Sequence, residues 1–329
     1  MIESKFHHPN HAVSGTGTPD VNLDDVSVFY GEVVGLSKVS IALSGGITGV
    51  VGPNGSGKTT IMRVLTGLIQ PVEGLLQVLG GNPFTDQDIR RRIGFVPATE
   101  CFHASLSGRR NLEVAFLSQG ATVAESRRKA SQGLELVGMT EDGNRTYGTW
   151  SRGMRQRLKI GLTLAGNPEL VLLDEPFLGV DPPSRRVLQT LIVELAAKGR
   201  TVFISSHVLH EIEMLTDQVI VLANGRVLGS GKISDLLLDL RDRHPHRIKL
   251  LGDEPRLLAA ELLKYDHVRE VKLTGKRIVE FITDRPDLVY RQLGEVVANT
   301  GHLIRRIETL DNGLEAVFHH VTQAGSRRL

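Results

Sequence analysis

The 329-residue sequence predicts an α/β protein with an antiparallel β-rich start and a largely parallel sheet, followed by a smaller α+β domain. Between Val21 and Val51, the short apolar runs "VSVFY" and "KVSIAL" are separated by glycines, which is typical of antiparallel strands joined by turns. From Ile61 to about Leu238, helical segments alternate with the apolar runs "RRIGFVP", "LVLLDEP", "TVFISSH" and "QVIVLANG". This alternation indicates a parallel sheet covered by helices, and we expect the domain to span residues 21–240.

Two further segments flank this domain. Residues 1–20 are polar and rich in Gly, Ser and Thr without periodicity, so we expect a flexible tail. After the charged stretch "RDRHPH", residues 246–329 predict an accessory or regulatory domain of βαβ halves, which favours a ferredoxin-like fold. The expected strands are 248–251, 268–274, 277–283 and 304–310, and the expected helices are 254–264, 286–298 and 314–322. The histidines of this part are expected in solvent rather than on a metal, namely His244, His246, His319 and His320.

Composition narrows the class of protein. A formal charge of +2 and 40% hydrophobic residues describe an ordinary globular chain without the basic field of nucleic-acid-binding proteins, so no nucleic acid is expected. The single cysteine, Cys101, cannot form an internal disulfide, and no charged-then-apolar leader opens the chain, which favours a cytoplasmic location. No stretch supplies the 18 or more apolar residues of a membrane helix. A membrane-embedded partner remains compatible with this composition.

A glycine-rich loop predicts a nucleotide site. In "VVGPNGSGKTT", Gly52, Gly57, Lys58 and Thr59 match the spacing G-x-x-x-x-G-K-[ST], directly after an apolar strand and before a helical run. Glycines let backbone N–H groups face phosphates, the lysine reaches the terminal phosphates, and the threonine hydroxyl faces magnesium. The alternative is a glycine-rich turn with a surface lysine. The residues expected to contact nucleotide are Gly52, Pro53, Asn54, Gly55, Ser56, Gly57, Lys58, Thr59 and Thr60.

Two strand ends carry polar residues that fit the same chemistry. "LVLLDEP" ends in Asp174 and Glu175, and carboxylates beside a buried strand need cations or polarised water as compensation. We expect Asp174, with Thr59, to hold Mg²⁺, and Glu175 to orient or deprotonate the attacking water. The alternative is a strand that simply ends in solvated acids. "TVFISSH" ends in Ser205, Ser206 and His207, which could hydrogen-bond the γ-phosphate or the water.

Over residues 20–240 the sequence resembles the nucleotide-binding subunits of ABC transporters, since several independent motifs occur in the family's order. The loop 52–59 is followed by "WSRGMRQRL" as the signature motif, "LLDEP" as the carboxylate strand, "GVDP" at Gly179–Pro182 as the D-loop and His207 as the switch histidine. Tyr30 in "SVFYG" resembles the family's adenine-stacking aromatic residue, and the alternative is an ordinary strand aromatic.

The resemblance implies an ATP hydrolase in which two such domains meet head to tail and enclose ATP and Mg²⁺. The catalytic residues would be Glu175, His207 and Lys58, while Ser151 and Gly153 would contact the γ-phosphate held by the opposite loop, near Asp181 of the D-loop. Physically, Ser151 caps a helix start whether or not a phosphate arrives. ATP contacting both faces only in the closed state would favour closure.

The resemblance also implies partners and a location. The chain would act as a homodimer or with a related ATPase subunit, beneath separate transmembrane permease subunits at the inner face of the cell membrane. The segment "GLEAVFHHVT" resembles the "LEDVF" helix of bacterial exporter ATPases for drugs, antibiotics or lipid-linked polymers. The alternatives are a soluble ABC ATPase without a transporter and a weakly hydrolysing nucleotide-sensing subunit.

Two departures from the family pattern bear on activity. Ala98 stands where the family usually has a glutamine at magnesium, so a water, Thr99 or Glu100 would replace it, or hydrolysis would be slow. Arg152 and Met154 stand where the common signature has glycine and glutamine. We expect the Arg152 side chain to point away from the phosphate, so that only its backbone matters.

Overall fold

The computed structural model describes residues 19–236, 246–275, 277–301 and 303–309. The chain divides into two compact units, Met1–Lys232 and Ile233–Leu329.

An antiparallel three-stranded sheet opens the first unit, with the order β2-β1-β4. Its strands are β1 (Val21–Tyr30), β2 (Val33–Leu43) and β4 (Glu73–Val78). β1 and β2 form the antiparallel pair that their alternating apolar residues predict. β4 follows the first helix of the chain and yet pairs with β1, a connection that the sequence pattern does not predict.

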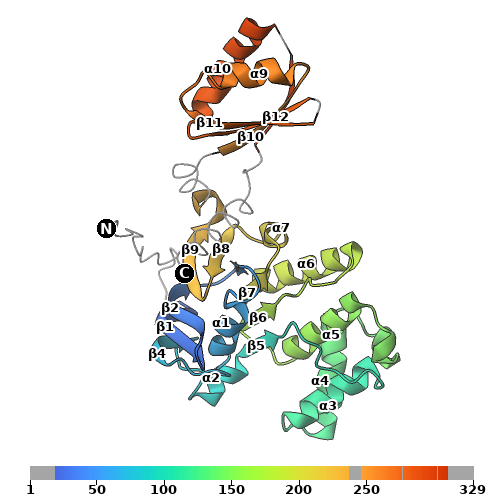
Figure 1. Ribbon diagram of the computed structural model, residues 1–329. Helices are drawn as coiled ribbons and strands as arrows, with labels where there is room; N and C mark the ends of the chain where they lie inside the picture. The colour runs from blue at the N-terminus through green and yellow to red at the C-terminus, as the bar shows by residue number, and fades with distance from the viewer. Residues whose placement is uncertain (1–18, 237–245, 276, 302, 310–329) are drawn as a thin grey trace. The chain divides into compact units, whose positions relative to one another are not determined.

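The second sheet of this unit has six strands in the order β5-β6-β7-β3-β8-β9 (Figure 1). All neighbouring pairs are parallel except β8 and β9, which confirms the predicted largely parallel sheet. β6 and β7 are buried along their whole length, as expected of central strands covered on both faces. The strands are β3 (Ile47–Val51), β5 (Ile93–Val96), β6 (Leu170–Asp174), β7 (Thr201–Ser206), β8 (Gln218–Ala223) and β9 (Arg226–Lys232).

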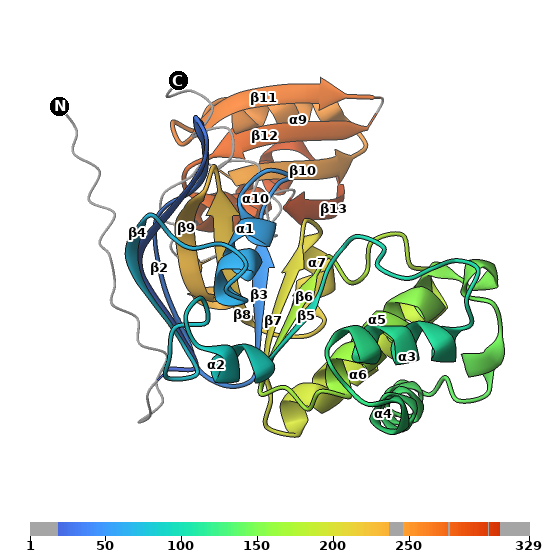
Figure 2. The same cartoon turned by 90° about the horizontal axis from the view of Figure 1, so that it is seen from below.

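Helices connect these strands and form a separate group beside the sheet. The connecting helices are α1 (Lys58–Leu65), α2 (Gln87–Arg91), α6 (Pro182–Ala197) and α7 (Leu209–Glu213). The helical group contains α3 (Gly108–Ser118), α4 (Val123–Leu136) and α5 (Arg152–Leu164), with short 3₁₀ turns at Asp142–Asn144 and Tyr147–Thr149. Figure 2 shows this group on one side of the parallel sheet, away from α1. α4 and α5 pack closely where Gly133 of α4 meets Gly161 of α5. A Cβ on Gly133 would lie only 2.8 Å from the Gly161 carbonyl oxygen.

The parallel register brings three strand ends to one edge. β7 lies between β6 and β3, with Asp174 opposite Ser205 and Val51 opposite Ser206. The segments that follow β3, β6 and β7 therefore begin side by side.

Asp20, one residue before the predicted start of the domain, is bonded to the folded part of the first unit. The Asp20 carboxylate accepts hydrogen bonds from the Gly45 amide at 2.9 Å and from the Thr201 hydroxyl at 2.5 Å. The prediction that the tail extends to residue 20 is therefore wrong at Asp20, because its carboxylate bonds the turn at Gly45 and the first residue of β7. Residues 1–18 of the predicted tail lie outside the described residues.

From His246 to Thr309, the described residues of the second unit form a four-stranded antiparallel sheet in the order β11-β12-β10-β13 with two helices. Its elements are β10 (His246–Gly252), α9 (Pro255–Leu262), β11 (Val268–Thr274), β12 (Ile278–Thr283), α10 (Pro286–Thr300) and β13 (Ile304–Thr309). Each predicted element from 248 to 310 is present with ends shifted by a few residues at most, whereas the predicted helix 314–322 lies outside the described residues. The ferredoxin-like assignment stays a prediction.

The two faces of this small sheet differ. Ile248, Leu250, Val279 and Phe281 form a core with the apolar residues of α9 and α10. His246 is also buried, so the prediction that it lies in solvent is wrong, because residue 246 has the parity of the core-facing positions of β10. His244, His319 and His320 lie outside the described residues.

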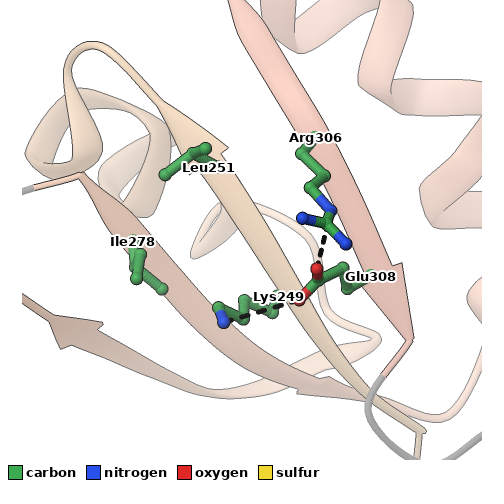
Figure 3. Close-up of a pocket in the computed structure, with 5 residues that line it drawn as sticks. All are labelled: Lys249, Leu251, Ile278, Arg306 and Glu308. Atoms are coloured by element: carbon green, nitrogen blue, oxygen red, sulfur yellow. Dashed lines mark ion pairs between the residues drawn. The ribbon is translucent and has the colours of Figure 1, made fainter.

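The opposite face of the small sheet carries a shallow pocket lined by Lys249, Leu251, Ile278, Arg306 and Glu308 (Figure 3). Glu308 pairs with Lys249 at 3.4 Å and with Arg306 at 2.7 Å. Both cations of the lining are thus already paired with its one carboxylate.

Candidate active site

The loop between β3 and α1 has the geometry of a phosphate cradle. Gly55 and Gly57 have φ values of 79° and 108°, which favour glycine. A Cβ on Gly52 would lie 2.3 Å from Ser56 Oγ and 2.5 Å from the Leu222 carbonyl oxygen, so a side chain there would force the loop apart. α1 begins after Gly57 without a side-chain cap and without an acidic residue in its first turn. Its free N–H groups and positive end therefore face the loop.

Ser56 supplies a further sign of an incomplete polar environment in this loop. It is buried, and its hydroxyl is among the buried side-chain atoms without a hydrogen-bond partner. Buried hydroxyls are normally paired, so this hydroxyl fits a site that a polar ligand completes.

Lys58 connects the loop with the carboxylate strand. Its ammonium donates to the carbonyl oxygens of Gly52 at 2.7 Å and Pro53 at 3.2 Å. It also lies 3.3 Å from Glu175 Oε1. The cation expected at the terminal phosphates therefore sits beside the carboxylate expected at the attacking water.

Asp174 and Thr59 form the expected pair of oxygen donors. The Thr59 hydroxyl donates to Asp174 Oδ2 at 2.8 Å, and the Asp174 side chain is only 2% exposed. Ser205 donates to Asp174 Oδ1 at 2.7 Å and accepts the Glu175 amide at 2.9 Å. A hydroxyl next to a carboxylate is a donor set that Mg²⁺ binds together with phosphate oxygens. The residues present therefore fit a magnesium ion.

Glu175 lies at the centre of the site. Its φ of 49° is in the left-handed region, which turns the chain sharply as it leaves β6. The side chain is 12% exposed and meets His207, whose Nδ1 lies 2.8 Å from Glu175 Oε2. The expected catalytic residues Glu175, His207 and Lys58 are thus in mutual contact through Glu175.

The two serines before His207 have other roles than expected. Ser205 contacts Asp174 and the Glu175 amide, as described above. Ser206 donates to Glu211 Oε2 at 2.6 Å and is buried. The hypothesis that both serines reach the γ-phosphate or water is not supported, because their hydroxyls are bound to carboxylates of the fold.

Tyr30 lies at the end of β1 beside the loop. Its hydroxyl is 3.4 Å from the Thr60 hydroxyl, and its ring approaches Gly35, where a Cβ would lie 2.8 Å from Tyr30 Cε2. The residue is 42% exposed. A half-exposed aromatic face next to the loop is available to a purine ring.

Ser151, Gly153 and Asp181 gather at a different place in the same unit. Ser151 caps α5 by accepting the Met154 amide at 3.2 Å, and Asp181 caps α6 by accepting the Ser184 amide at 3.0 Å. The Ser184 amide holds the pKa of the Asp181 carboxyl below its ordinary value. Gly153 faces Ser184, because a Cβ on Gly153 would lie 2.4 Å from Ser184 Cβ. The structure thus places the helix starts together, apart from α1 in both views (Figures 1 and 2).

The Arg152 side chain makes a packing contact that the sequence analysis does not predict. A Cβ on Gly179 would lie 2.0 Å from Arg152 Nη1 and 3.0 Å from Arg152 Cζ, so the guanidinium covers this glycine. Gly179 has a φ of 68°. The expectation that only the backbone of Arg152 matters is therefore revised, since its side chain packs on the turn 179–181.

The loop that carries Ala98 is tied to the helical group. Lys159 of α5 is buried and donates to the carbonyl oxygens of Pro97 at 2.9 Å and Thr99 at 3.3 Å. Burial lowers the pKa of Lys159. No sequence motif predicts these hydrogen bonds. The one signal is that Lys159 stands inside the apolar helix run "RLKIGL", where a buried lysine needs a polar partner.

Glu100 is occupied in the same group rather than at the magnesium donors. Its carboxylate accepts a hydrogen bond from the Tyr147 hydroxyl and lies 3.6 Å from Arg155. Burial, followed by this hydrogen bond to Glu100, raises the pKa of Tyr147. Glu100 was one of the candidates to replace the missing glutamine at the magnesium donors. Its carboxylate instead contacts Tyr147 and Arg155.

Comparisons with known proteins agree with this geometry. A protein-family model described as ABC transporter matches residues 36–178. The linearmycin resistance ATP-binding protein LnrL of Bacillus subtilis is 32% identical over 304 residues, which cover 91% of this chain and 97% of that protein. The bacitracin transport ATP-binding protein BcrA of Bacillus licheniformis is 37% identical over 212 residues, which cover 63% of this chain and 68% of that protein.

Solved structures include the dimeric post-hydrolysis state of an ATP-binding cassette bound to ADP and Pi. It matches with a TM-score of 0.57 and 26% identity, over 64% of this chain and 98% of that one. The fold and the loop together define an ATP-binding cassette. The chain belongs to the ATP-binding proteins of ABC transporters and is the ATP-hydrolysing subunit of a transporter of the exporter type.

Proposed function

We propose that ATP binds across the loop 52–60, with its adenine on Tyr30 and its terminal phosphates at Lys58. Support comes from the positive φ values of Gly55 and Gly57, from the uncapped start of α1 and from the unpartnered Ser56 hydroxyl. Thr59 and Asp174 would hold Mg²⁺, which when bound neutralises charge on the phosphates.

Hydrolysis would depend on Glu175 as the residue that orients the water and receives its proton. The observation that carries this proposal is the convergence on one carboxylate of Lys58 at 3.3 Å and His207 at 2.8 Å. Lys58 is the phosphate ligand of the loop, so the carboxylate lies where an attack on the terminal phosphate would start. His207 would hold the carboxylate in that orientation and contact the phosphate.

We further propose that each site is completed by a second subunit, either another copy or a related ATPase. Ser151 and Gly153, with Asp181 nearby, present two adjacent helix starts, which attract anions through free N–H groups and the helix dipole. In both views these starts lie apart from α1 of the same chain. A second copy in head-to-tail orientation would bring them to its neighbour's phosphates.

Closure and opening of the dimer would change the conformation of separate transmembrane permease subunits, which it contacts at the inner face of the membrane. Among the described residues no helix is long and apolar enough to cross a bilayer. Relatives named for bacitracin transport and for linearmycin resistance support a role in the export of compounds of this kind.

Glu175→Gln tests the proposed chemistry. A general base contributes about 100-fold or more to a rate, so turnover of ATP should fall by at least that factor. ATP affinity, measured by equilibrium binding, should stay within about twofold because the loop and its lysine are unchanged. Glu135→Gln on the exposed surface of α4 is the matched control and should leave turnover as in the wild type. Substantial turnover in Glu175→Gln would refute the assigned role.

A further inference from the structure

A buried carboxylate lies behind the site without belonging to it. Glu211 of α7 is 7% exposed, and both of its carboxylate oxygens are bonded. Oε1 pairs with Arg185 Nη1 at 2.9 Å, and Oε2 accepts the Ser206 hydroxyl at 2.6 Å. Because Glu211 is shielded from water, salt screens this pair much less than a surface ion pair.

Each end of this ion pair reaches a segment of functional interest. On one side, Arg185 of α6 donates through Nη2 to the Val180 carbonyl oxygen at 3.3 Å, within the turn 179–181. On the other side, the Ser206 hydroxyl accepts the Val208 amide at 3.0 Å. Ser206 and Val208 are the two neighbours of His207 in the chain.

These contacts make a continuous path between two parts of the site. It runs from Val180 through Arg185, Glu211 and Ser206 to the backbone on both sides of His207, whose ring contacts Glu175. An ion pair that served stability alone would have no need to end on these two segments, and apolar residues could often replace it.

We propose that Arg185 and Glu211 are positioning residues that couple the turn 179–181 to His207. This inference rests on the proposed function, in which the turn faces the partner subunit and His207 serves its own chain's nucleotide. A displacement of the turn on dimer closure would move Arg185, and through Glu211 and Ser206 it would set the His207 backbone. The orientation of Glu175 in one site would thereby depend on the fit of the interface.

Two variants break this path in different ways. Glu211→Gln keeps the size of the side chain and its hydrogen bond to Ser206, but it removes the charge that holds Arg185. Arg185→Lys keeps the charge, but a single ammonium lacks the fork that reaches Val180 and Glu211 together. Glu113→Gln is the matched control, since Glu113 pairs with Arg110 at 2.9 Å on α3, away from this path.

The experiment measures kcat, ATP affinity, thermal unfolding and the imidazole signals of His207 in histidine-selective ¹⁵N spectra of the full chain. The His207 signals are assigned with His207→Gln. Both variants should lower kcat about tenfold, the scale of coupling between distinct sites, and should shift the His207 signals while ATP affinity stays within about twofold. The combination Glu211→Gln with Arg185→Lys should lower kcat no further than either change alone. Glu113→Gln should change none of these quantities.

Three outcomes would overturn the inference: unchanged kcat in both variants, unchanged His207 signals despite lower kcat, or multiplicative losses in the combination. If one variant fails to fold, kcat and the His207 signals are measured in the other. If both quantities are unchanged there, the inference is overturned. Failure of the proposed function is distinguishable, because the wild type would then hydrolyse no ATP or would hydrolyse it without Glu175.

Discussion

The backbone at Glu175 shows how one residue adapts a strand end to chemistry. A left-handed φ in a residue other than glycine costs about 1–3 kcal/mol, and such conformations persist where the surroundings hold them. Here the Ser205 hydroxyl holds the Glu175 amide, while Lys58 and His207 hold the carboxylate. The sequence motif "LLDEP" predicts that Glu175 is the carboxylate of the candidate site. The left-handed backbone conformation of Glu175 is seen only in the structure.

Ala98 permits a direct test at the level of a single side chain. If the missing amide limits hydrolysis, Ala98→Gln should raise turnover severalfold, about the effect of one added hydrogen bond of about 1 kcal/mol, and leave ATP affinity nearly unchanged. Turnover at saturating ATP and equilibrium binding of ATP are the two measurements. Ala98→Leu is the control, because it adds volume without an amide and should not raise turnover. Unaltered turnover in Ala98→Gln would show that Ala98 is not limiting.

The sequence predicts which residues of the candidate site lie together much better than it predicts the contacts between them. The motif spacing marks Lys58, Asp174 and His207, because each follows a recognisable apolar run. It assigns no partner to Ser206, since Glu211 lies on a short helix whose sequence "LHEIE" carries no motif. Arg185 was missed for the same reason, as one of two adjacent arginines on α6.

At the scale of elements, two glycines determine how α5 meets the turn before α6. Gly153 allows the first turn of α5 to approach Ser184, and Gly179 accepts the Arg152 guanidinium where a side chain would collide. The helix start that carries Ser151 and the turn that carries Asp181 therefore form one packed assembly. They should move together rather than independently.

Arg152→Ala should loosen this assembly. The change removes the cover of Gly179 and should lower turnover about fivefold, corresponding to about 1 kcal/mol, by weakening the closed dimer. Sedimentation in the presence of ATP and the Glu175→Gln background, in which little ATP is consumed, should show less dimer. The control is Arg128→Ala, an exposed arginine on α4. A dimer fraction and turnover equal to those of the wild type would restore the original expectation that only the Arg152 backbone matters.

Helices and strands could be predicted from the pattern of apolar residues where those residues are buried. Fully buried β6 and β7 appear as unbroken apolar runs, and the helix α10 begins at the proline that the sequence places there. β4 was missed because its residues "EGLLQV" are largely at the surface, with Leu75 70% exposed. Without a buried face, a strand has no alternating pattern to detect.

At the scale of the whole molecule, the order of strands is the part that sequence patterns leave open. β3 lies between β7 and β8, although residues 52–200 separate β3 from β7 along the chain. Such pairings depend on long-range packing rather than on local propensity. The described residues 246–309 of the small second unit are simpler, since their short antiparallel strands and their helices follow the predicted order of elements closely.

The central claim, that each ATP is shared by two chains, can be tested by mixing two inactive variants. Lys58→Ala disables the loop, and Gly153→Asp displaces the start of α5, because a side chain there collides with Ser184. Mixed in equal amounts, they should form heterodimers that contain one intact composite site, and activity should recover to about a quarter of the wild type. A mixture no more active than its components, or full activity of Gly153→Asp on its own, would contradict the shared site.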